Sequence, residues 1–331
     1  MQAEVVVVGA GVMGAATARA LAQQGRDVLL VEQFEVGHTR GSSHGRSRIV
    51  RLAYPEVEFV ELAQEAFAGW RELEQESGQQ LLELNGLLEL VESAGQSSQD
   101  ALEAVGAEYE LLGAGEARGR WPVGVPEGWT ALFQPEAGIV RSDLAHRALV
   151  DGAVANGARL QENTHIESLD DVEAKAVVVT AGAWVTDLVP DLPVHTTRET
   201  VAYFRREGEP LPSIVALDPV TRGHAMYSLH DPEHGLKAGA HHAGARVGPD
   251  VPGEADPALV ERIIDWVART YPDADPDPVA AETCMYTTTA DEHFILERHG
   301  KVVIGSACSG HGFKFAPAVG ARLATLAADI L

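Results

Sequence analysis

The sequence predicts an α/β fold, in which a domain with a parallel sheet is joined to a second, α+β domain with an antiparallel sheet. Three observations lead to this prediction. An apolar run at residues 5–8 leads into a glycine-rich turn and then into a stretch of strong helix formers. Short strand patterns dominate residues 193–283. The chain has 331 residues, which is long enough for the cores of two domains.

The glycine-rich turn after the first strand pattern has the spacing of a dinucleotide-binding motif. Gly9 permits a sharp turn, Gly11 lets a pyrophosphate approach the backbone, and Gly14 lets the next helix pack against the strand. The helix N-terminus would direct its N–H groups at the phosphates. A second strand pattern ends at Glu32, whose carboxylate is placed to accept hydrogen bonds from an adenosine ribose. This unit is typical of a Rossmann-like domain, and the motif alone does not choose between NAD and FAD.

A loop crowded with small, hydroxyl and cationic residues follows at residues 37–51. It contains Arg40, Ser42 and Ser43, and it holds four arginines in an acidic chain. These arginines could pair with surface acids, which would contribute little to stability. We favour a second interpretation, a cradle for another part of the cofactor, because the loop directly follows the dinucleotide unit. Backbone N–H groups and guanidinium groups would there meet phosphate and ring carbonyls.

A helical pattern at residues 59–76 is followed by antiparallel strand patterns. Residues 82–90 hold an Asn-Gly pair between short apolar runs, which predicts a β-hairpin. Such a hairpin belongs to an antiparallel sheet, so we place a domain boundary near residue 84. Short helices are then expected at residues 99–106 and 115–121.

Strand and helix patterns alternate in the next part of the chain. Residues 131–140 have the pattern of strand, turn and strand, and Asp143 is expected to cap a helix over residues 143–155. Residues 177–184 contain a buried strand pattern that ends in glycine at Gly182. This pattern fits a return to the cofactor domain, and we assign Gly182 to cofactor binding.

The C-terminal stretch again places a glycine-rich loop after a strand. A helix at residues 257–271 precedes it, a strand is expected at residues 301–305, and Pro317 opens a final helix. Gly310 and Gly312 lie before this helix. Because a helix N-terminus suits an anionic group, we assign both glycines to cofactor binding.

No internal repeat or long linker is visible, so both domains are expected to be assembled from separated segments. The domain that binds the dinucleotide cofactor would comprise residues 1–84, 142–192 and 284–331. The second domain, which would hold the substrate, would comprise residues 85–141 and 193–283.

The net charge of −24 at pH 7, with a pI near 4.8, argues against several partners. Nucleic acids and anionic membranes both need a basic protein surface. The apolar stretch at residues 5–18 is interrupted by glycines and has no basic lead-in, so we expect neither a signal peptide nor a membrane span. We therefore expect a cytoplasmic protein in which Cys284 and Cys308 are reduced thiols.

Several motifs of the chain resemble those of one enzyme family. They are G-A-G-V-M-G at 9–14, S-S-H-G-R-S-R-I-V-R at 42–51, G-L-K-A-G-A-H at 235–241, C-M-Y at 284–286, D-E-H-F at 291–294 and S-G-H-G-F-K-F at 309–315. The pattern resembles, essentially end to end, the family of monomeric sarcosine oxidase and N-methyltryptophan oxidase, which also includes pipecolate oxidases. The resemblance implies an FAD-binding domain of the D-amino-acid oxidase type.

The resemblance also implies roles for individual residues. FAD would be attached covalently to the sulfur of Cys284, and a thiolate is independently a suitable nucleophile if positive charge lowers its pKa. Arg51 and Lys314 would bind the substrate carboxylate, with Lys314 also near the cofactor, and Lys237 would activate O₂. The flavin face would be lined by His44, Arg48, Tyr227, His241 and Tyr286. The alternatives are a small buried thiol, a solvated Lys237, a structural His241, and an Arg51 paired with a nearby acid.

Five histidines lie between His224 and His242, a density that could indicate a metal site. His230 and His234 have the spacing of helical zinc ligands, but Pro232 between them disfavours a helix. The other candidates are consecutive and cannot easily converge on one ion: Asp291, Glu292 and His293. We therefore expect no metal site.

Together these observations predict an FAD-dependent enzyme that oxidises a carboxylate-bearing secondary amine with O₂. The products would be hydrogen peroxide and an imine, which hydrolyses to an aldehyde and an amino acid. Sarcosine is the default substrate, and other N-methyl amino acids and cyclic imino acids remain open. The alternatives are a glycine or D-amino-acid oxidase with non-covalent FAD, and a flavin-carrying subunit that is not an oxidase. We expect a monomer.

Overall fold

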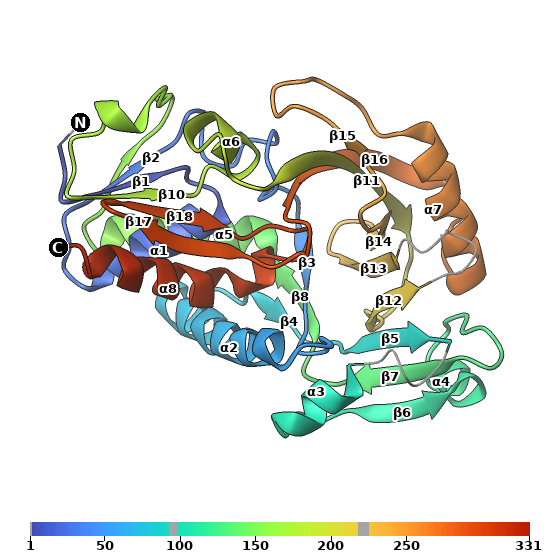
Figure 1. Ribbon diagram of the computed structural model, residues 1–331. Helices are drawn as coiled ribbons and strands as arrows, with labels where there is room; N and C mark the ends of the chain where they lie inside the picture. The colour runs from blue at the N-terminus through green and yellow to red at the C-terminus, as the bar shows by residue number, and fades with distance from the viewer. Residues whose placement is uncertain (1, 93–97, 218–224) are drawn as a thin grey trace.

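The computed structural model describes residues 2–92, 98–217 and 225–331, and in these residues the chain forms two parts (Figure 1). The part at the left of Figure 1 holds a sheet with helices packed against it, and the part at the right holds a larger sheet. This arrangement confirms the predicted fold class, a parallel-sheet domain with a second, mainly antiparallel domain. His224 lies outside the described residues, so the structure describes only the other four histidines of the histidine-rich stretch.

The first sheet has, in the described residues, six strands in the order β17 (Ile295–His299), β18 (Val302–Ser306), β10 (Ala176–Val179), β1 (Val5–Val8), β2 (Val28–Val31) and β9 (Arg159–Gln161). The N-terminal apolar run forms β1, which is paired in parallel on both edges, with β10 and β2. Its four valines are buried, as a central parallel strand requires. Only β17 runs antiparallel to its neighbour.

Helices pack against this sheet and against one another: α1 (Val12–Gln23), α2 (Val57–Ser77), α5 (Ser142–Ala155), α6 (Val185–Leu188) and α8 (Ala316–Ala328). A Cβ at Gly320 would lie 2.6 Å from the Cβ of Ala16, so a glycine in α8 allows α1 and α8 to approach closely. Trp70 of α2 is fully buried, and its Nε1 donates a 2.7 Å hydrogen bond to the carbonyl oxygen of Lys314. This contact holds the loop before α8 in place.

The second sheet has, in the described residues, nine strands: β15 (Ala245–Arg246), β11 (His195–Arg205), β14 (Gly235–Ala240), β13 (Ala225–Asp231), β12 (Ser213–Leu217), β5 (Leu87–Val91), β7 (Thr130–Gln134) and β6 (Glu110–Gly113) in this order, with β16 (Pro278–Thr288) paired to β11. Neighbouring strands are antiparallel except β12 and β5. Helices α4 (Ala114–Arg120) and α7 (Pro257–Thr270) pack against this sheet, whereas α3 (Gln99–Ala104) packs against α2. Ile263 and Val267 of α7 are fully buried in the core of this part.

The predicted hairpin at residues 82–90 is wrong. β4 (Leu82–Glu83) pairs with β8 (Gly138–Arg141) in a three-stranded sheet that also contains β3 (Ser47–Val50), whereas β5 belongs to the second sheet. Gly86 has φ +89°, and a Cβ there would lie 2.5 Å from Cε2 of Phe133. Gly86 is needed where the chain crosses closely between two sheets, because its φ is positive and a side chain would have no room. An Asn-Gly hairpin turn also needs a glycine with positive φ, so the two structures share one local signal.

The helix starts differ slightly from the sequence prediction. α5 begins at Ser142, so Asp143 is not its cap. Asp143 lies in the first turn, where a carboxylate still interacts favourably with the helix dipole. Val319 and Leu323 of α8 are fully buried, whereas Leu326 and, beyond the helix end, Ile330 are only partly buried.

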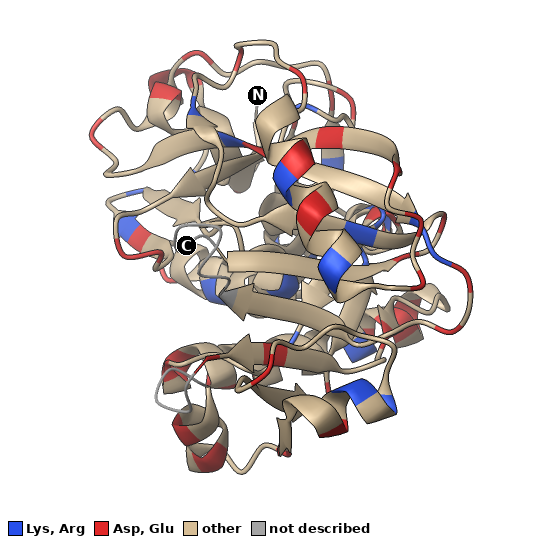
Figure 2. Ribbon diagram, turned by 90° about the vertical axis from the view of Figure 1, so that its right-hand side faces the viewer, with Lys and Arg blue, Asp and Glu red and all other residues tan. Residues whose placement is uncertain are grey.

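Charged residues are spread over both parts of the molecule (Figure 2). Acidic positions lie on helices and loops throughout that view, with fewer basic positions among them, as the net charge of −24 requires. Among the described helices, none is both long enough and apolar enough to cross a membrane. The exact residues at which the two domains meet stay a prediction.

Candidate active site

One cavity is lined by strands of both large sheets and by the loop at residues 41–48. One of its ends lies at the glycine-rich turn and Glu32, and the other is lined by Lys237, His241 and Lys314. The cavity therefore connects the dinucleotide motif with the residues to which the sequence assigns chemistry.

The turn between β1 and α1 has the geometry that its glycines predict. Gly9 has φ +97°, a conformation that favours glycine, and Gly11 lines the cavity directly before α1. A Cβ on Gly14 would lie 1.8 Å from the carbonyl oxygen of Gly9, so α1 can begin here only without a side chain at Gly14. Glu32 is buried at the end of β2, and its Oε2 accepts a 2.8 Å hydrogen bond from the backbone N–H of Ala10.

Ser42 and Ser43 attach the loop to both parts of the cavity wall, and both line the cavity. Ser43 Oγ accepts a 3.0 Å hydrogen bond from the backbone N–H of Val12 in α1. Ser42 Oγ donates a hydrogen bond to the carbonyl oxygen of Met285 in β16. The loop therefore bridges the two large sheets beside the cavity.

Two other predicted cofactor-binding residues differ in their placement. Gly182 follows β10, has φ +54° and lines the cavity. Arg40 is exposed and, in the described structure, is not part of the cavity lining. Its guanidinium carbon lies 4.5 Å from the ring centre of Phe34. This is a cation–π contact, and the assignment of Arg40 to cofactor binding stays a prediction.

Lys237 of β14 is buried beside Arg48 of β3. Its Nζ lies 3.5 Å from the carbonyl oxygen of Ser47, a long hydrogen bond. Arg48 donates to the carbonyl oxygens of Ser47 at 2.9 Å and Ser42 at 3.0 Å. Burial, followed by the charge of Arg48, lowers the pKa of Lys237 to about 7. Lys237 therefore changes its charge close to neutral pH.

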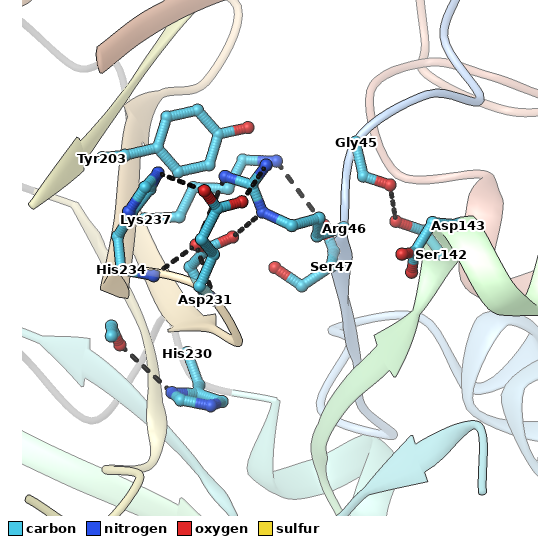
Figure 3. Close-up of polar contacts among 12 residues, drawn as sticks. Gly45, Arg46, Ser47, Ser142, Asp143, Tyr203, His230, Asp231, His234 and Lys237 are labelled. Carbon is cyan, nitrogen blue, oxygen red and sulfur yellow. Dashed lines mark hydrogen bonds and ion pairs between the residues drawn. The ribbon is translucent and has the colours of Figure 1, made fainter. Parts of the chain in front are cut away.

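An ion pair near Lys237 joins Arg46 of the loop to Asp231 of the second sheet (Figure 3). Asp231 is fully buried, and its Oδ1 lies 3.2 Å from Nε of Arg46. The other carboxylate oxygen accepts the backbone N–H of His234 at 2.9 Å. The guanidinium of Arg46 and the ammonium of Lys237 lie 5.0 and 5.7 Å from the ring centre of Tyr203. This cluster holds the strand that carries Lys237 against the loop.

His44 lines the same end of the cavity with a neutral imidazole. Burial, followed by the charges of Arg48 and Lys237, lowers the pKa of His44 to about 4. Its Nε2 is buried without a hydrogen-bond partner among the described residues. A neutral His44 therefore offers one donor or acceptor to a group in the cavity.

Three aromatic side chains form the wall opposite the loop. His241 Nδ1 lies 3.4 Å from the hydroxyl of Tyr286, and the two rings meet at 63°. The ring of Tyr227 is perpendicular to that of His241, with centres 6.3 Å apart. A Cβ on Gly310 would lie 2.4 Å from Tyr286 and 2.6 Å from His241. Gly310 is therefore required for close packing against this wall, in addition to any contact with a cofactor.

Arg51 and Lys314 both contact Tyr54. The ring centre of Tyr54 lies 4.4 Å from the guanidinium carbon of Arg51 and 5.5 Å from Nζ of Lys314. Lys314 is buried and donates to the hydroxyl of Tyr54 at 2.9 Å and to the carbonyl oxygen of His311 at 2.7 Å. Burial, followed by the charge of Arg51, holds the pKa of Lys314 well below its usual range. The structure thus brings two cations from opposite ends of the chain to one site.

The ion pair of Arg51 is long. Its Nη1 lies 3.8 Å from Oε2 of Glu89, and Glu89 accepts shorter hydrogen bonds from the backbone N–H and the hydroxyl of Ser98, at 2.9 and 2.7 Å. Glu58, a nearby acid in the sequence, instead contacts His293 at 2.7 Å. Arg51 lines the cavity and so presents its guanidinium to whatever binds there.

Sequence reasoning did not assign His311, which lines the cavity, or Tyr54, which contacts Arg51 and Lys314. Nδ1 of His311 lies 3.2 Å from the hydroxyl of Tyr54, and burial lowers the pKa of His311 to about 3. Burial raises the pKa of Tyr54 to about 12. Tyr54 follows Arg51 by three residues and His311 lies between Gly310 and Gly312, so proximity to assigned residues was the available signal.

The two cysteines occupy different places beside the cavity. Cys284 lines it near Lys237 and Arg48, whose charges lower the thiol pKa, but burial is the larger effect and raises it. Cys308 Sγ lies 3.9 Å from Ser42 Oγ and 4.0 Å from the carbonyl oxygen of Met285. Both cysteines are free thiols.

The cavity wall has the properties that an FAD site requires. His44 Nε2, Ser47 Oγ and Thr287 Oγ1 are buried, line the cavity, and have no hydrogen-bond partner among the described residues. Unpaired buried polar groups are costly, so they suit a polar ring system that supplies their partners. The glycine-rich turn and Glu32 at the other end suit a pyrophosphate and a ribose.

Comparisons with known proteins agree with this geometry. Residues 4–326 match the model of the FAD dependent oxidoreductase family, DAO. The chain is 36% identical to peroxisomal sarcosine oxidase of Mus musculus, an alignment that covers 96% of this chain and 90% of the relative. It is 32% identical to monomeric sarcosine oxidase of Bacillus sp. (strain B-0618), with 98% and 92% covered.

A solved structure agrees with both results. NikD, an unusual amino acid oxidase essential for nikkomycin biosynthesis, superposes with a TM-score of 0.86 at 26% identity, covering 98% of this chain and 93% of NikD. The resemblance deduced from the motifs is thereby confirmed. The chain belongs to the family of FAD-dependent oxidoreductases that includes the sarcosine oxidases.

Proposed function

We propose that this FAD-dependent oxidoreductase oxidises a carboxylate-bearing secondary amine, with sarcosine as the default substrate, and transfers the electrons to O₂. The observation that carries the proposal is that Arg51 and Lys314, from opposite ends of the chain, both contact Tyr54. Two neighbouring cations in a buried site repel each other and lose hydration, so an anion between them is strongly favoured. A substrate carboxylate would take two hydrogen bonds from Arg51 and a point charge from Lys314.

FAD, when bound, supplies the acceptor for the two electrons and hydrogen removed from the C–N bond of the amine. Its pyrophosphate would be held at Gly9, Gly11 and Gly14, and its ribose at Glu32. Around the ring, the neutral His44 and the hydroxyls of Ser42 and Ser43 are available as hydrogen-bonding partners. The amine loses two electrons and becomes an imine, which water hydrolyses, and O₂ takes up two electrons and two protons to give hydrogen peroxide.

Lys237 is proposed to assist the transfer to O₂. Negative charge develops on O₂ as it accepts electrons, and a cation fixed beside it stabilises that charge. The buried position of Lys237 between Arg48 and Tyr203 supports this role, because a cation in a poorly solvated site acts strongly on its neighbours. Arg48, Tyr227, His241 and Tyr286 would orient the amine and the flavin ring.

Cys284 is proposed to bond covalently to the cofactor. Its place on the cavity wall and the two cations near it support attachment, since both cations favour a thiolate. Burial favours the neutral thiol instead, which supports the alternative of a non-covalent FAD. Acid precipitation separates the two, because a covalent flavin stays in the yellow pellet.

The carboxylate proposal is tested with two amines. Sarcosine and N-methylethylamine both carry a secondary amine, but only sarcosine has a carboxylate. The wild type should strongly prefer sarcosine, and Arg51→Gln should lose most of this preference, about tenfold to a hundredfold, since a charge-assisted hydrogen bond contributes roughly 1.5–3 kcal/mol.

A matched control is Arg71→Gln, because Arg71 is exposed and pairs with Glu136 at 2.6 Å away from the cavity lining. Its preference for sarcosine should equal that of the wild type. Equal preference in wild type and Arg51→Gln would show that Arg51 does not recognise the carboxylate.

We also propose that the enzyme is a monomer in the cytoplasm. The printed name of the Bacillus relative, monomeric sarcosine oxidase, supports the first part, whereas the mouse relative is named peroxisomal, so the compartment needs its own measurement. Sedimentation equilibrium would measure the oligomeric state, and a mass of two chains would contradict the proposal.

A further inference from the structure

Two residues at one edge of the cavity have backbone conformations that side chains disfavour. His242 has φ +54° and Glu292 has φ +63°. In the described chain only two further non-glycine residues, Asn163 and Ser309, have positive φ. Such conformations persist where the surrounding structure requires them, and they are frequent at binding sites. At His242 and Glu292 we can identify what the conformation achieves.

The conformation of His242 brings two consecutive imidazoles together. His241 directly follows strand β14, and successive side chains of an extended strand point to opposite faces. With its left-handed backbone, His242 instead places its ring centre 4.1 Å from that of His241. Both rings therefore lie on the same side of the chain.

Glu292 reaches the two histidines from a separate loop, between β16 and β17. Its Oε1 lies 3.5 Å from Nε2 of His242. One ligand atom from each of His241, His242 and Glu292 lies within 4.8 Å of the other two. His242 Nε2 is buried and makes no hydrogen bond within the described residues. Two imidazole nitrogens and a carboxylate oxygen thus converge, with the long contact to Glu292 as the polar contact of His242 Nε2 among the described residues.

Two further contacts orient the residues of this cluster. Nδ1 of His241 lies 3.4 Å from the hydroxyl of Tyr286, and the backbone carbonyl of Glu292 accepts a 3.1 Å contact from Nε2 of His311. Partners of this kind fix the orientation of side chains that bind metal ions. The carboxylate of Glu292 is about half exposed, at 53%, so an ion can reach the cluster from solvent.

We propose that His241, His242 and Glu292 bind one divalent transition-metal ion of the zinc type at the edge of the cavity. Two nitrogens and one carboxylate oxygen are ligands that Zn²⁺ takes, with the remaining position open to water. Tetrahedral bonds of about 2.0–2.1 Å separate neighbouring ligand atoms by roughly 3.3 Å, close to the distance between His242 and Glu292. Mg²⁺ and Ca²⁺ prefer oxygen ligands and do not fit.

This proposal departs from the sequence expectation that the chain binds no metal. That expectation compared neighbours in sequence: Glu292 with Asp291 and His293, and His230 with His234. In the described structure His230 faces the carbonyl oxygen of Gly235 and His293 pairs with Glu58. The convergence of His241 and His242 with Glu292 depends on two left-handed residues and on the packing of β14 beside the 289–293 loop, which periodicity does not reveal.

The test measures ion binding directly and needs no amine oxidation, so it is independent of the proposed function. The flavin-loaded enzyme is treated with EDTA, dialysed, and titrated with Zn²⁺ and with Mg²⁺ by calorimetry. The wild type should bind one Zn²⁺ per chain and no Mg²⁺. His242→Asn, which keeps a residue tolerant of the left-handed backbone, and Glu292→Gln should each weaken Zn²⁺ binding by at least about tenfold to a hundredfold.

His293→Asn is the matched control, because His293 is the next residue after Glu292 but contacts Glu58 and Asp291 instead. It should bind Zn²⁺ like the wild type. Flavin absorbance and the melting temperature show that each variant is folded, and either ligand variant suffices for the comparison. No saturable Zn²⁺ binding by the wild type, unchanged affinity in the folded ligand variants, or an equal loss in His293→Asn would overturn the proposal.

Discussion

The two ends of the cavity hold their groups by different physical means. At the dinucleotide end the contacts come from backbone: the turn with Gly9 and Gly14, the start of α1, and one carboxylate at Glu32. At the other end the contacts come from buried cations, Lys237 and Lys314, which lie in segments far apart in sequence. The first end is shaped before any ligand arrives, whereas at the second end burial lowers the pKa of both lysines, and an anionic ligand would favour their charged forms.

This difference predicts different responses to mutation. A side chain added at the dinucleotide end collides with backbone and changes stability. A charge removed at the amine end should leave the fold in place and change the chemistry, because an unpaired buried cation does not stabilise the protein. Four experiments separate these responses, beginning with the largest expected effect.

The largest effect concerns Cys284, which lines the cavity near Lys237 and Arg48. The intact mass of the wild type should exceed that of the bare chain by one FAD, and Cys284→Ser should remove this increment completely. Cys308→Ser is the control and should retain it, since Cys308 contacts Ser42 and Met285 and is not a proposed attachment point. A wild-type mass equal to that of the bare chain would contradict covalent attachment.

Lys237→Met tests the amine end alone. Removing one fixed cation from a developing negative charge typically costs on the order of 10²-fold or more, so reoxidation by O₂ should slow by that factor. Stopped-flow absorbance of the flavin measures both half-reactions, and reduction by the amine should change less. Lys175→Met is the control, because Lys175 is exposed and pairs with Glu4. Unchanged reoxidation in Lys237→Met would remove the proposed role.

Gly14→Ala tests the dinucleotide end. The new Cβ would lie 1.8 Å from the carbonyl oxygen of Gly9, so we expect a loss of about 1–3 kcal/mol in the free energy of unfolding. Gly119→Ala makes the same change in helix α4, where a Cβ meets nothing within 4 Å, and should be neutral or slightly stabilising. Equal denaturation midpoints for the two variants would show that the close approach at Gly14 is not required.

The smallest effect is the dependence of reoxidation on pH. The pKa of Lys237 is lowered to about 7, so Lys237 is charged below this pH and loses its proton above it. The proposed role needs the cation, and reoxidation should therefore be fastest below pH 7 and fall about tenfold per pH unit well above it. Lys237→Met should show no such decline. A flat wild-type profile across this range would mean that the charge of Lys237 does not assist O₂.

The same contrast explains what the sequence could predict. The dinucleotide end is local, so the strand, the three glycines and Glu32 are recognisable within one stretch of chain, and the structure confirms the fold that they predict. The placement of Tyr54 beside both Arg51 and Lys314 depends on how α2 and the loop before α8 pack together, and no periodicity signals it. Arg40 belongs to the same arginine-rich loop as Arg51, yet it contacts Phe34 and is not among the described residues that line the cavity.

The error at residues 82–90 has a similar cause. An Asn-Gly pair between apolar runs satisfies the local rule for a hairpin, but β4 and β5 find partners in different sheets. Local turn chemistry restricts the backbone at Gly86 without specifying which strands pair, because pairing depends on segments distant in sequence. The chain crosses between sheets at this point and carries the apolar run of β5 into the second domain.

The strand order of the first sheet also constrains how the protein is synthesised. β1 is made first, but its partner β10 is 168 residues or more behind it, and β18, which pairs with the other edge of β10, begins only at residue 302. During translation the valines of β1 therefore emerge with one edge unpaired until most of the chain has left the ribosome. Long-range parallel pairing forms slowly and leaves apolar edges exposed to aggregation meanwhile. Production of this protein should consequently benefit from slow expression and from chaperones that shield β1.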